Sequence, residues 1–227
     1  MGTKNHNRKI ILELSILFSL FYLPAYLFQN TIGDPSVFNE PLFNLQLWIT
    51  YIPQISLILY LIYRNDQKDF NDFGVKRLYL KDIPYIALTA AALLIIIGII
   101  QIIFTLLPSS ITGEDLFLWN LHNRKVIPLI LISSILTGYS EELFFRSYLY
   151  TNLEDLKFSK LHIIITVNLI FSLGHFYEGY AGGINAFILG CFFSVIFLWK
   201  RNIHIIAIVH GIYNFSVLLL SYFYGVQ

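Results

Sequence analysis

The sequence predicts an all-α fold, a multi-pass bundle of about seven transmembrane helices with a cytoplasmic N-terminus. Three observations lead to this prediction. The composition is rich in apolar residues and poor in charge, the apolar runs are long enough to cross a bilayer, and Lys and Arg are unevenly shared among the connecting segments. Together they predict a single integral-membrane domain, residues 1–227, in the cell membrane.

The composition excludes most other classes of protein. Of the 227 residues, 56% are hydrophobic and 13% are charged, whereas soluble domains carry about 45–50% apolar and about 25% charged residues. The same composition excludes a disordered chain. A net charge of +1 offers no basic surface to nucleic acid, so the expected surroundings are the lipid bilayer. The abundance of Ile, Phe, Tyr, Asn and Lys favours a bacterial, AT-rich source.

Apolar runs define the expected spans, because a helix needs about 20 residues to cross a hydrocarbon core of about 30 Å. Two of the runs, 161–176 and 183–199, are short, and the segment 177–182 between them is rich in glycine. We therefore expect a loop there and one tilted or broken span. The seven runs are 10–28, 42–63, 84–108, 126–150, 161–176, 183–199 and 203–224.

The basic residues predict the orientation. Twelve of the 15 Lys and Arg residues fall in the N-terminal segment and in the three connections that seven alternating spans place on the same side. The other side receives Arg124 and Lys125, and Arg146 lies within the fourth span. The positive-inside rule then predicts a cytoplasmic N-terminus and a C-terminus outside. No internal repeat is evident, which disfavours an inverted-repeat transporter.

The fourth span carries charges where they are costly. An ionisable group at the bilayer centre costs at least about 2.5–3.5 kcal/mol and usually marks function. Glu142 and Arg146 have the i, i+4 spacing of a helical ion pair. Glu141 points about 100° away from Glu142, in line with Ser133 and Thr137, which would direct it into the bundle interior. The alternative is that these groups only hold helices together.

Two further spans carry polar residues on one face. Asn168, Phe171 and His175 share a face of the fifth span, and His210 and Asn214 share a face of the seventh. Either set, taken alone, is compatible with helix–helix packing.

Depth favours a common site. At about 1.5 Å per residue from the predicted cytoplasmic ends, Glu141 lies roughly 13 Å, His175 roughly 21 Å and His210 roughly 10 Å into the membrane. We therefore expect the three to meet in one layer of the cytoplasmic half. Glu178 could orient His175, although capping of the span end is the favoured interpretation.

These residues resemble the CAAX-prenyl-endopeptidase and bacteriocin-processing family of intramembrane proteases, called CPBP or ABI. The resemblance covers about residues 126–217, and the first three spans carry no recognisable motif. The family motifs are EExxxR, FxxxH and a histidine four residues before a polar residue. They occur here in order and in separate apolar spans, as Glu141-Glu142-Leu-Phe-Phe-Arg146, Phe171-Ser-Leu-Gly-His175 and His210-Gly-Ile-Tyr-Asn214.

The resemblance implies an endopeptidase that cuts a membrane-associated peptide or protein. In such an enzyme Glu141 and His175 would activate a water molecule for attack on a peptide carbonyl. His210 and Asn214 would stabilise the resulting oxyanion, as donors in a low-dielectric cavity can. The residues expected to support the cavity around them are Glu142, Arg146 and Phe171.

Participation of a metal stays open at this point. Two histidines and a glutamate can hold a catalytic Zn²⁺, and the set would be Glu141, His175 and His210. The sequence contains no HExxH motif, and a mechanism without metal is favoured.

Other functions are also weighed. A serine intramembrane protease needs a GxSxG-like nucleophile and an aspartyl one needs two embedded Asp, and the sequence has neither. A non-proteolytic protein for bacteriocin self-immunity or for assembly of a membrane complex is the main alternative. An ion-coupled transporter with a Glu/His proton relay is disfavoured by the short chain without repeats.

Overall fold

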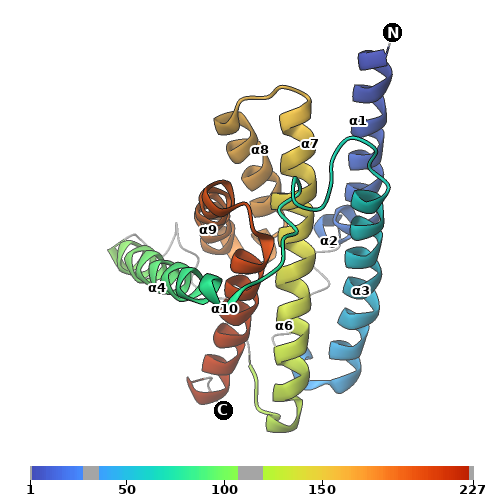
Figure 1. Cartoon of the computed structure of the whole chain (residues 1–227). Helices are drawn as coiled ribbons and strands as arrows, with labels where there is room; N and C mark the ends of the chain where they lie inside the picture. The colour runs from blue at the N-terminus through green and yellow to red at the C-terminus, as the bar shows by residue number, and fades with distance from the viewer. Residues whose placement is uncertain (1, 28–35, 107–119, 225–227) are drawn as a thin grey trace.

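In the computed structural model, residues 2–27, 36–106 and 120–224 are described, and within them the regular structure is helical (Figure 1). The prediction of an all-α fold is confirmed. The helices are α1 (Gly2–Phe21), α2 (Leu23–Leu27), α3 (Pro41–Tyr63), α4 (Ile83–Leu106), α6 (Ile127–Glu142), α7 (Tyr150–Asp155), α8 (Lys160–Leu173), α9 (Gly179–Lys200) and α10 (Ile203–Tyr224), with the π-helix η5 (Leu143–Leu149) and the 3₁₀ turns η2 (Val37–Asn39), η3 (Leu80–Asp82), η4 (Arg124–Val126) and η6 (Phe176–Glu178).

Five of the described helical segments are long and apolar enough to cross a membrane. They contain α3, α4, the continuous α6–η5–α7 rod, α9 and α10. The other two predicted spans differ from this group. Helix α8 has only 14 residues. Helix α1 begins at Gly2, so it includes the basic residues that the sequence placed before the first span. The predicted ends at positions 28 and 107–108 lie outside the described residues.

The predicted loop at 177–182 is wrong. Phe176–Glu178 forms one turn of 3₁₀ helix, and α9 begins at Gly179, whose φ of +84° permits the sharp change of direction. The neighbouring glycines serve close packing within the helix. A Cβ at Gly182 would lie 2.4 Å from the Glu178 Cβ, too close to be tolerated without a shift. Helix α9 is consequently a full 22 residues long.

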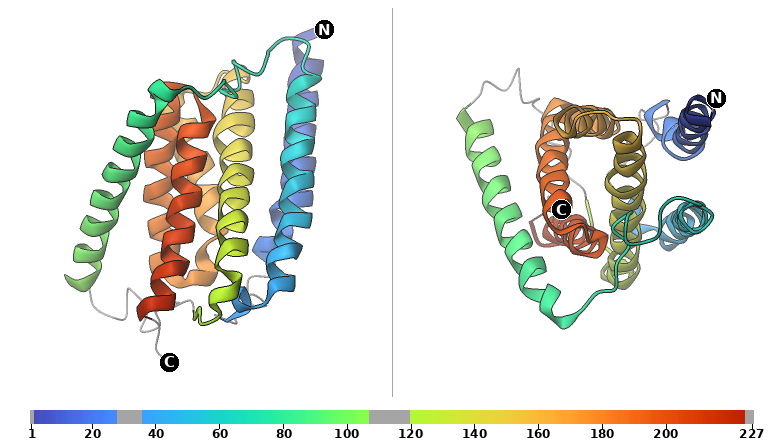
Figure 2. Two further views of the ribbon diagram at one scale, coloured as in Figure 1. Left: turned by 60° about the horizontal axis from the view of Figure 1, so that its bottom comes forward. Right: turned by 45° about the horizontal axis from the view of Figure 1, so that its top comes forward.

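The continuous α6–η5–α7 rod stands between the other helices. It packs against α10 on one side and α3 on the other, while α8 pairs with α9, and α4 lies against α9 and α10. Figure 2 shows the start of α1 and the α3–α4 connection at one end of the bundle, with the end of α10 at the other. The α7–α8 and α9–α10 connections lie at the same end of the bundle as the start of α1.

The two ends of the bundle are closed differently. At the end with the α3–α4 connection, Phe73 is fully buried and its carbonyl accepts a hydrogen bond from the Ser147 hydroxyl. At the opposite end, the Asn39 side chain ties η2 to the segment before α6. Its Oδ1 accepts the backbone N–H groups of His122 and Asn123, each at 2.8 Å. This amide therefore fixes the start of α3 beside the start of α6.

Candidate active site

A cavity of about 270 Å³ lies between α3, α6, α8, α9 and α10. All four residues predicted to be catalytic line it, namely Glu141, His175, His210 and Asn214, and Phe171 lines it as well. The predicted stripe of Ser133, Thr137 and Glu141 also faces this cavity. The structure therefore brings the sequence-predicted residues together around one space.

The position of the cavity along the bundle differs from the prediction. The sequence placed the site in the half nearest the Lys/Arg-rich connections. The cavity instead extends from Glu141 toward the opposite end, where Phe38 and Phe43 of the η2–α3 region and Leu218 of α10 line it. The predicted depths of Glu141, His175 and His210 could not show this. They place three residues along the membrane normal but do not show toward which end of the bundle the helices move apart.

Glu141 and His210 face each other across the α6–α10 interface. The Glu141 Oε2 atom lies 3.6 Å from the His210 Nε2 atom, and within the described residues this oxygen accepts no hydrogen bond. A buried carboxylate oxygen without a hydrogen-bond donor is costly. It is therefore suited to accept a proton from a water molecule in the cavity.

His175 lies just past the end of α8, where its ring is fixed by the backbone. Its Nδ1 atom lies 3.0 Å from the Phe171 carbonyl oxygen. Because a carbonyl can only accept, Nδ1 carries the hydrogen, and in the neutral ring Nε2 has the free lone pair. The Phe171 and His175 rings also pack with their centroids 4.6 Å apart. Asn168, predicted on the same face, is instead fully buried and does not line the cavity.

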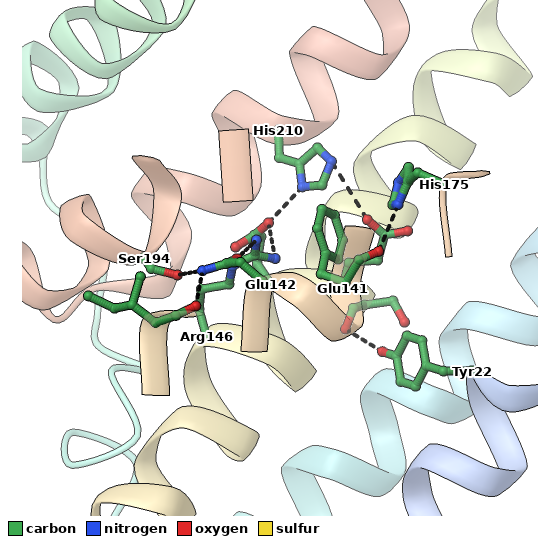
Figure 3. Close-up of polar contacts among 11 residues, drawn as sticks. Tyr22, Glu141, Glu142, Arg146, His175, Ser194 and His210 are labelled. Atoms are coloured by element: carbon green, nitrogen blue, oxygen red, sulfur yellow. Dashed lines mark hydrogen bonds and ion pairs between the residues drawn. The ribbon is translucent and has the colours of Figure 1, made fainter. Parts of the chain in front are cut away.

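Glu142 has a partner that the sequence did not reveal. Its Oε1 atom accepts from Arg146 Nη1 at 3.1 Å, as the spacing predicted, and also lies 2.7 Å from His210 Nδ1. All atoms of the Glu142 and Arg146 side chains are shielded from solvent. In Figure 3 the imidazole of His210 lies between the carboxylates of Glu141 and Glu142. Glu142 thus orients His210 so that Nε2 faces Glu141.

The polar chain continues to two more helices. Arg146 Nη2 donates to Asn168 Oδ1 at 2.9 Å, and Asn168 Nδ2 donates to Ser194 Oγ at 2.9 Å (Figure 3). Gly190 leaves room for it, since a Cβ there would lie 2.4 Å from Asn168 Oδ1 and 2.8 Å from Arg146 Nη2. Sequence reasoning missed Ser194 and Gly190. An i, i+4 pair of small residues on an apolar helix was their only signal.

Two glycines set the distance between α6 and α10. A Cβ at Gly138 would lie 2.7 Å from the backbone nitrogen of Gly211, and a Cβ at Gly211 would lie 2.8 Å from the Cα of Ile135. Small residues let helix backbones approach closely. Because Gly138 lies one turn before Glu142 and Gly211 follows His210, this close approach brings the Glu142 and His210 side chains within hydrogen-bond reach.

Among the other residues that line the cavity, Glu178 was considered from the sequence, whereas Tyr51 and Tyr177 were not predicted. Tyr51 of α3, Tyr177 and Glu178 line the same space as Glu141. Glu178 occupies the N-cap position of α9 but makes no capping hydrogen bond with its side chain. Its favoured interpretation as a cap is therefore wrong. Tyr51 could not be found from the motifs, because α3 lies outside the region that carries them.

A metal site was tested on the same residues. Within the described ranges, no three side chains of His, Cys, Asp or Glu are grouped as the ligands of a metal ion would be. The Nδ1 atom of His210 is engaged by Glu142, and that of His175 by a backbone carbonyl. Both rings keep Nε2 for a further contact, and Nε2 is the atom that metal-ligating histidines commonly use when Nδ1 is held by a carboxylate or a carbonyl.

The chain was compared with known proteins. Residues 123–216 match the family model described as type II CAAX prenyl endopeptidase Rce1-like. These bounds agree closely with the region 126–217 that carries the three motifs. No curated protein and no solved structure matches the chain.

Proposed function

We propose that the chain is an intramembrane endopeptidase whose substrate is a membrane-associated peptide or protein, in keeping with the match of residues 123–216 to the family model described as type II CAAX prenyl endopeptidase Rce1-like. The observation that carries this proposal is the cavity between five helices, into which Glu141, His175, His210 and Asn214 all project. A carboxylate and imidazoles around one enclosed space can supply both a base and oxyanion donors.

In the proposed reaction, Glu141 is the general base. Its carboxylate accepts a proton from water while the water oxygen attacks the peptide carbonyl carbon, with His175 Nε2 holding the water. The tetrahedral oxyanion accepts hydrogen bonds from His210 and from the Asn214 amide. When the C–N bond breaks, the proton held by Glu141 passes to the leaving nitrogen. The products are a carboxylic acid and an amine.

His210 requires a proton on Nε2 to act as an oxyanion donor. Its Nδ1 already faces Glu142 at 2.7 Å, so a donor at Nε2 means a doubly protonated, positive ring. Glu142 is then a positioning residue that balances this charge. Arg146 holds the Glu142 carboxylate from the other side, which keeps it in place between the two cations.

The finer topology belongs to the same proposal. We propose a single integral-membrane domain with seven crossing segments, a cytoplasmic N-terminus and a place in a bacterial plasma membrane. Five long apolar helices and the shorter α8 support it, as do the start of α1 and the end of α10, which lie at opposite ends of the bundle (Figure 2). The remaining crossing segment would be formed by α1.

The test is the substitution Glu141→Gln. The amide keeps the shape but cannot take a proton from water, so cleavage should fall by about 10²- to 10⁴-fold, the usual contribution of a general base. Comparative peptidomics of cells that carry the wild type or the variant would identify products that disappear. Glu13→Gln is the matched control, since Glu13 lies in α1 and does not line the cavity. Unchanged products in Glu141→Gln, with normal membrane insertion, would contradict the proposal.

A further inference from the structure

The cavity is built from one end of the bundle. Its walls include Phe43 early in α3, Ser133 early in α6 and Gly182 early in α9. They also include Tyr177 beyond the end of α8 and Leu218 late in α10. Each of these positions lies toward the end of the bundle where α10 finishes. The cavity therefore approaches the surface at that end.

The opposite end is blocked by packed side chains. Phe73, Tyr150 and Phe197 all have no exposed surface, and the Tyr150 and Phe197 rings pack with their centroids 6.4 Å apart. The backbone also ties this end together, because the Ile203 N–H donates to the Gly74 carbonyl oxygen at 2.8 Å. None of these residues lines the cavity that contains Glu141, so this layer separates the cavity from that end of the bundle.

The basic residues gather at the blocked end. The α3–α4, α7–α8 and α9–α10 connections, together with the first residue of α8 and the last residue of α9, carry nine of the 15 Lys and Arg residues, whereas Arg124 and Lys125 are the basic residues of the predicted opposite side. Positive charges in short connections mark the cytoplasmic side of a membrane protein. The blocked end is therefore cytoplasmic, and the open end of the cavity faces away from the cytoplasm.

We propose that this peptidase takes its substrate from the non-cytoplasmic face of the membrane. The substrate class is then an exported peptide, or a segment of a membrane protein exposed on that face, rather than the tail of a cytoplasmic protein. This inference rests on the proposed function for the cleavage itself. The direction of access rests only on the cavity, the blocked end and the distribution of Lys and Arg.

Single cysteines test the direction of access without any substrate. The natural thiol is first removed by Cys191→Ser, since this is the one cysteine of the chain. Val217→Cys then places a thiol in the cavity wall, and Leu220→Cys is its matched control on the exposed side of the same helix. Asn65→Cys and Asn120→Cys report the two ends of the bundle. Each variant is treated with the membrane-impermeant thiosulfonate MTSES, in spheroplasts and in inverted vesicles.

The expected result is reaction of Val217→Cys and Asn120→Cys at least about tenfold faster in spheroplasts than in inverted vesicles, with the reverse for Asn65→Cys. Leu220→Cys should react slowly in both, because it faces lipid. Faster reaction of Val217→Cys in inverted vesicles would overturn the proposal. So would a Val217→Cys thiol that MTSES modifies in neither preparation but does modify after the protein is denatured. Leu47→Cys, on the α3 wall of the cavity, repeats the test if Val217→Cys does not insert.

The labelling separates this inference from the proposed catalytic role. Adding Glu141→Gln to Val217→Cys should leave the labelling unchanged, because access does not depend on the base. Loss of cleavage with outside labelling would support both proposals. Outside labelling with cleavage that does not need Glu141 would overturn only the proposed mechanism.

Discussion

Glu142 is the residue on which most of the buried polar structure depends. One of its oxygens serves both His210 and Arg146, while the other is buried without a hydrogen bond in the described part of the chain. A buried ion pair is weak evidence for stability, because desolvation offsets the attraction between the charges. Its value here is the placement of His210, and stability suffers only when one charge is left alone.

A double-mutant cycle on this pair separates the two contributions. Glu142→Leu and Arg146→Met should each lower the free energy of unfolding by about 3–5 kcal/mol, since each leaves an uncompensated buried charge. The double variant should recover most of that loss but none of the cleavage, because His210 has lost its carboxylate partner. Unfolding in detergent micelles measures the first quantity and peptidomics the second. Strictly additive losses of stability would show that the two charges do not interact.

At the residue scale, spacing along a helix could be predicted and contacts between helices could not. The i, i+4 rule gave the Glu142–Arg146 pair, because both residues lie on one helix. The bond from Glu142 to His210 joins residues 68 positions apart, and no local pattern carries that information. The four residues predicted to be catalytic were identified from the family resemblance and from similar depths in the membrane. Tyr51 and Glu178 belong to no motif.

At the scale of the element, α6 departs from the regular helix that its sequence predicts. The seven residues of η5 form a π-helix and are all buried. π-Helical segments are rare overall, and those that occur are often found at functional sites. The π-helix begins directly after Glu142, so its wider turn changes the direction of Arg146 relative to an ideal α-helix. Hydropathy predicts where a helix crosses the membrane, but it carries no signal for a change in helix type.

The glycine contact between α6 and α10 gives an element-scale prediction. Gly138→Ala should destabilise the protein by about 1–3 kcal/mol, as overpacking of a tight interface does, and should lower cleavage by moving His210 away from Glu142. Gly98→Ala in α4 is the control, because a Cβ there meets nothing within 4 Å. That control should be neutral or stabilising by up to about 1 kcal/mol, since Ala is the better helix former. Equal effects of the two substitutions in thermal unfolding would contradict this account of the interface.

At the scale of the whole molecule, the α3–α4 connection is part of the fold rather than a solvated loop. Phe73 fills the end of the bundle with no exposed surface, stacks on Tyr148 with ring centroids 5.7 Å apart, and accepts from Ser147. The sequence showed a segment dense in charge, Asn and Gly, and that composition is typical of exposed connections. One aromatic residue among polar neighbours was not enough to predict that Phe73 would be buried at the end of the bundle.

Phe73→Ala tests the closed end. Loss of a large buried ring should cost about 3–5 kcal/mol of stability and should allow MTSES to reach Val217→Cys from inverted vesicles. Leu80→Ala in the same connection is the control, because Leu80 is 85% exposed, and it should change neither quantity. Thermal unfolding and thiol labelling provide the measurements. If Phe73→Ala changed neither the stability nor the labelling, Phe73 would not be closing this end of the bundle.

The Glu142–Arg146 pair also bears on how the chain enters the membrane during synthesis. Each charge alone would add about 2.5–3.5 kcal/mol to the cost of inserting its helix. Both lie one turn apart on the same continuous rod, 3.1 Å from each other, so these two charges compensate each other when the rod passes from the translocon into lipid, and Glu141 is left as the acidic residue of this level without a basic partner on the rod. Helices α8, α9 and α10, which bring Asn168, Ser194 and His210, are made later. The pair therefore lets the nascent chain carry its future catalytic support into the bilayer before the helices that will use it exist.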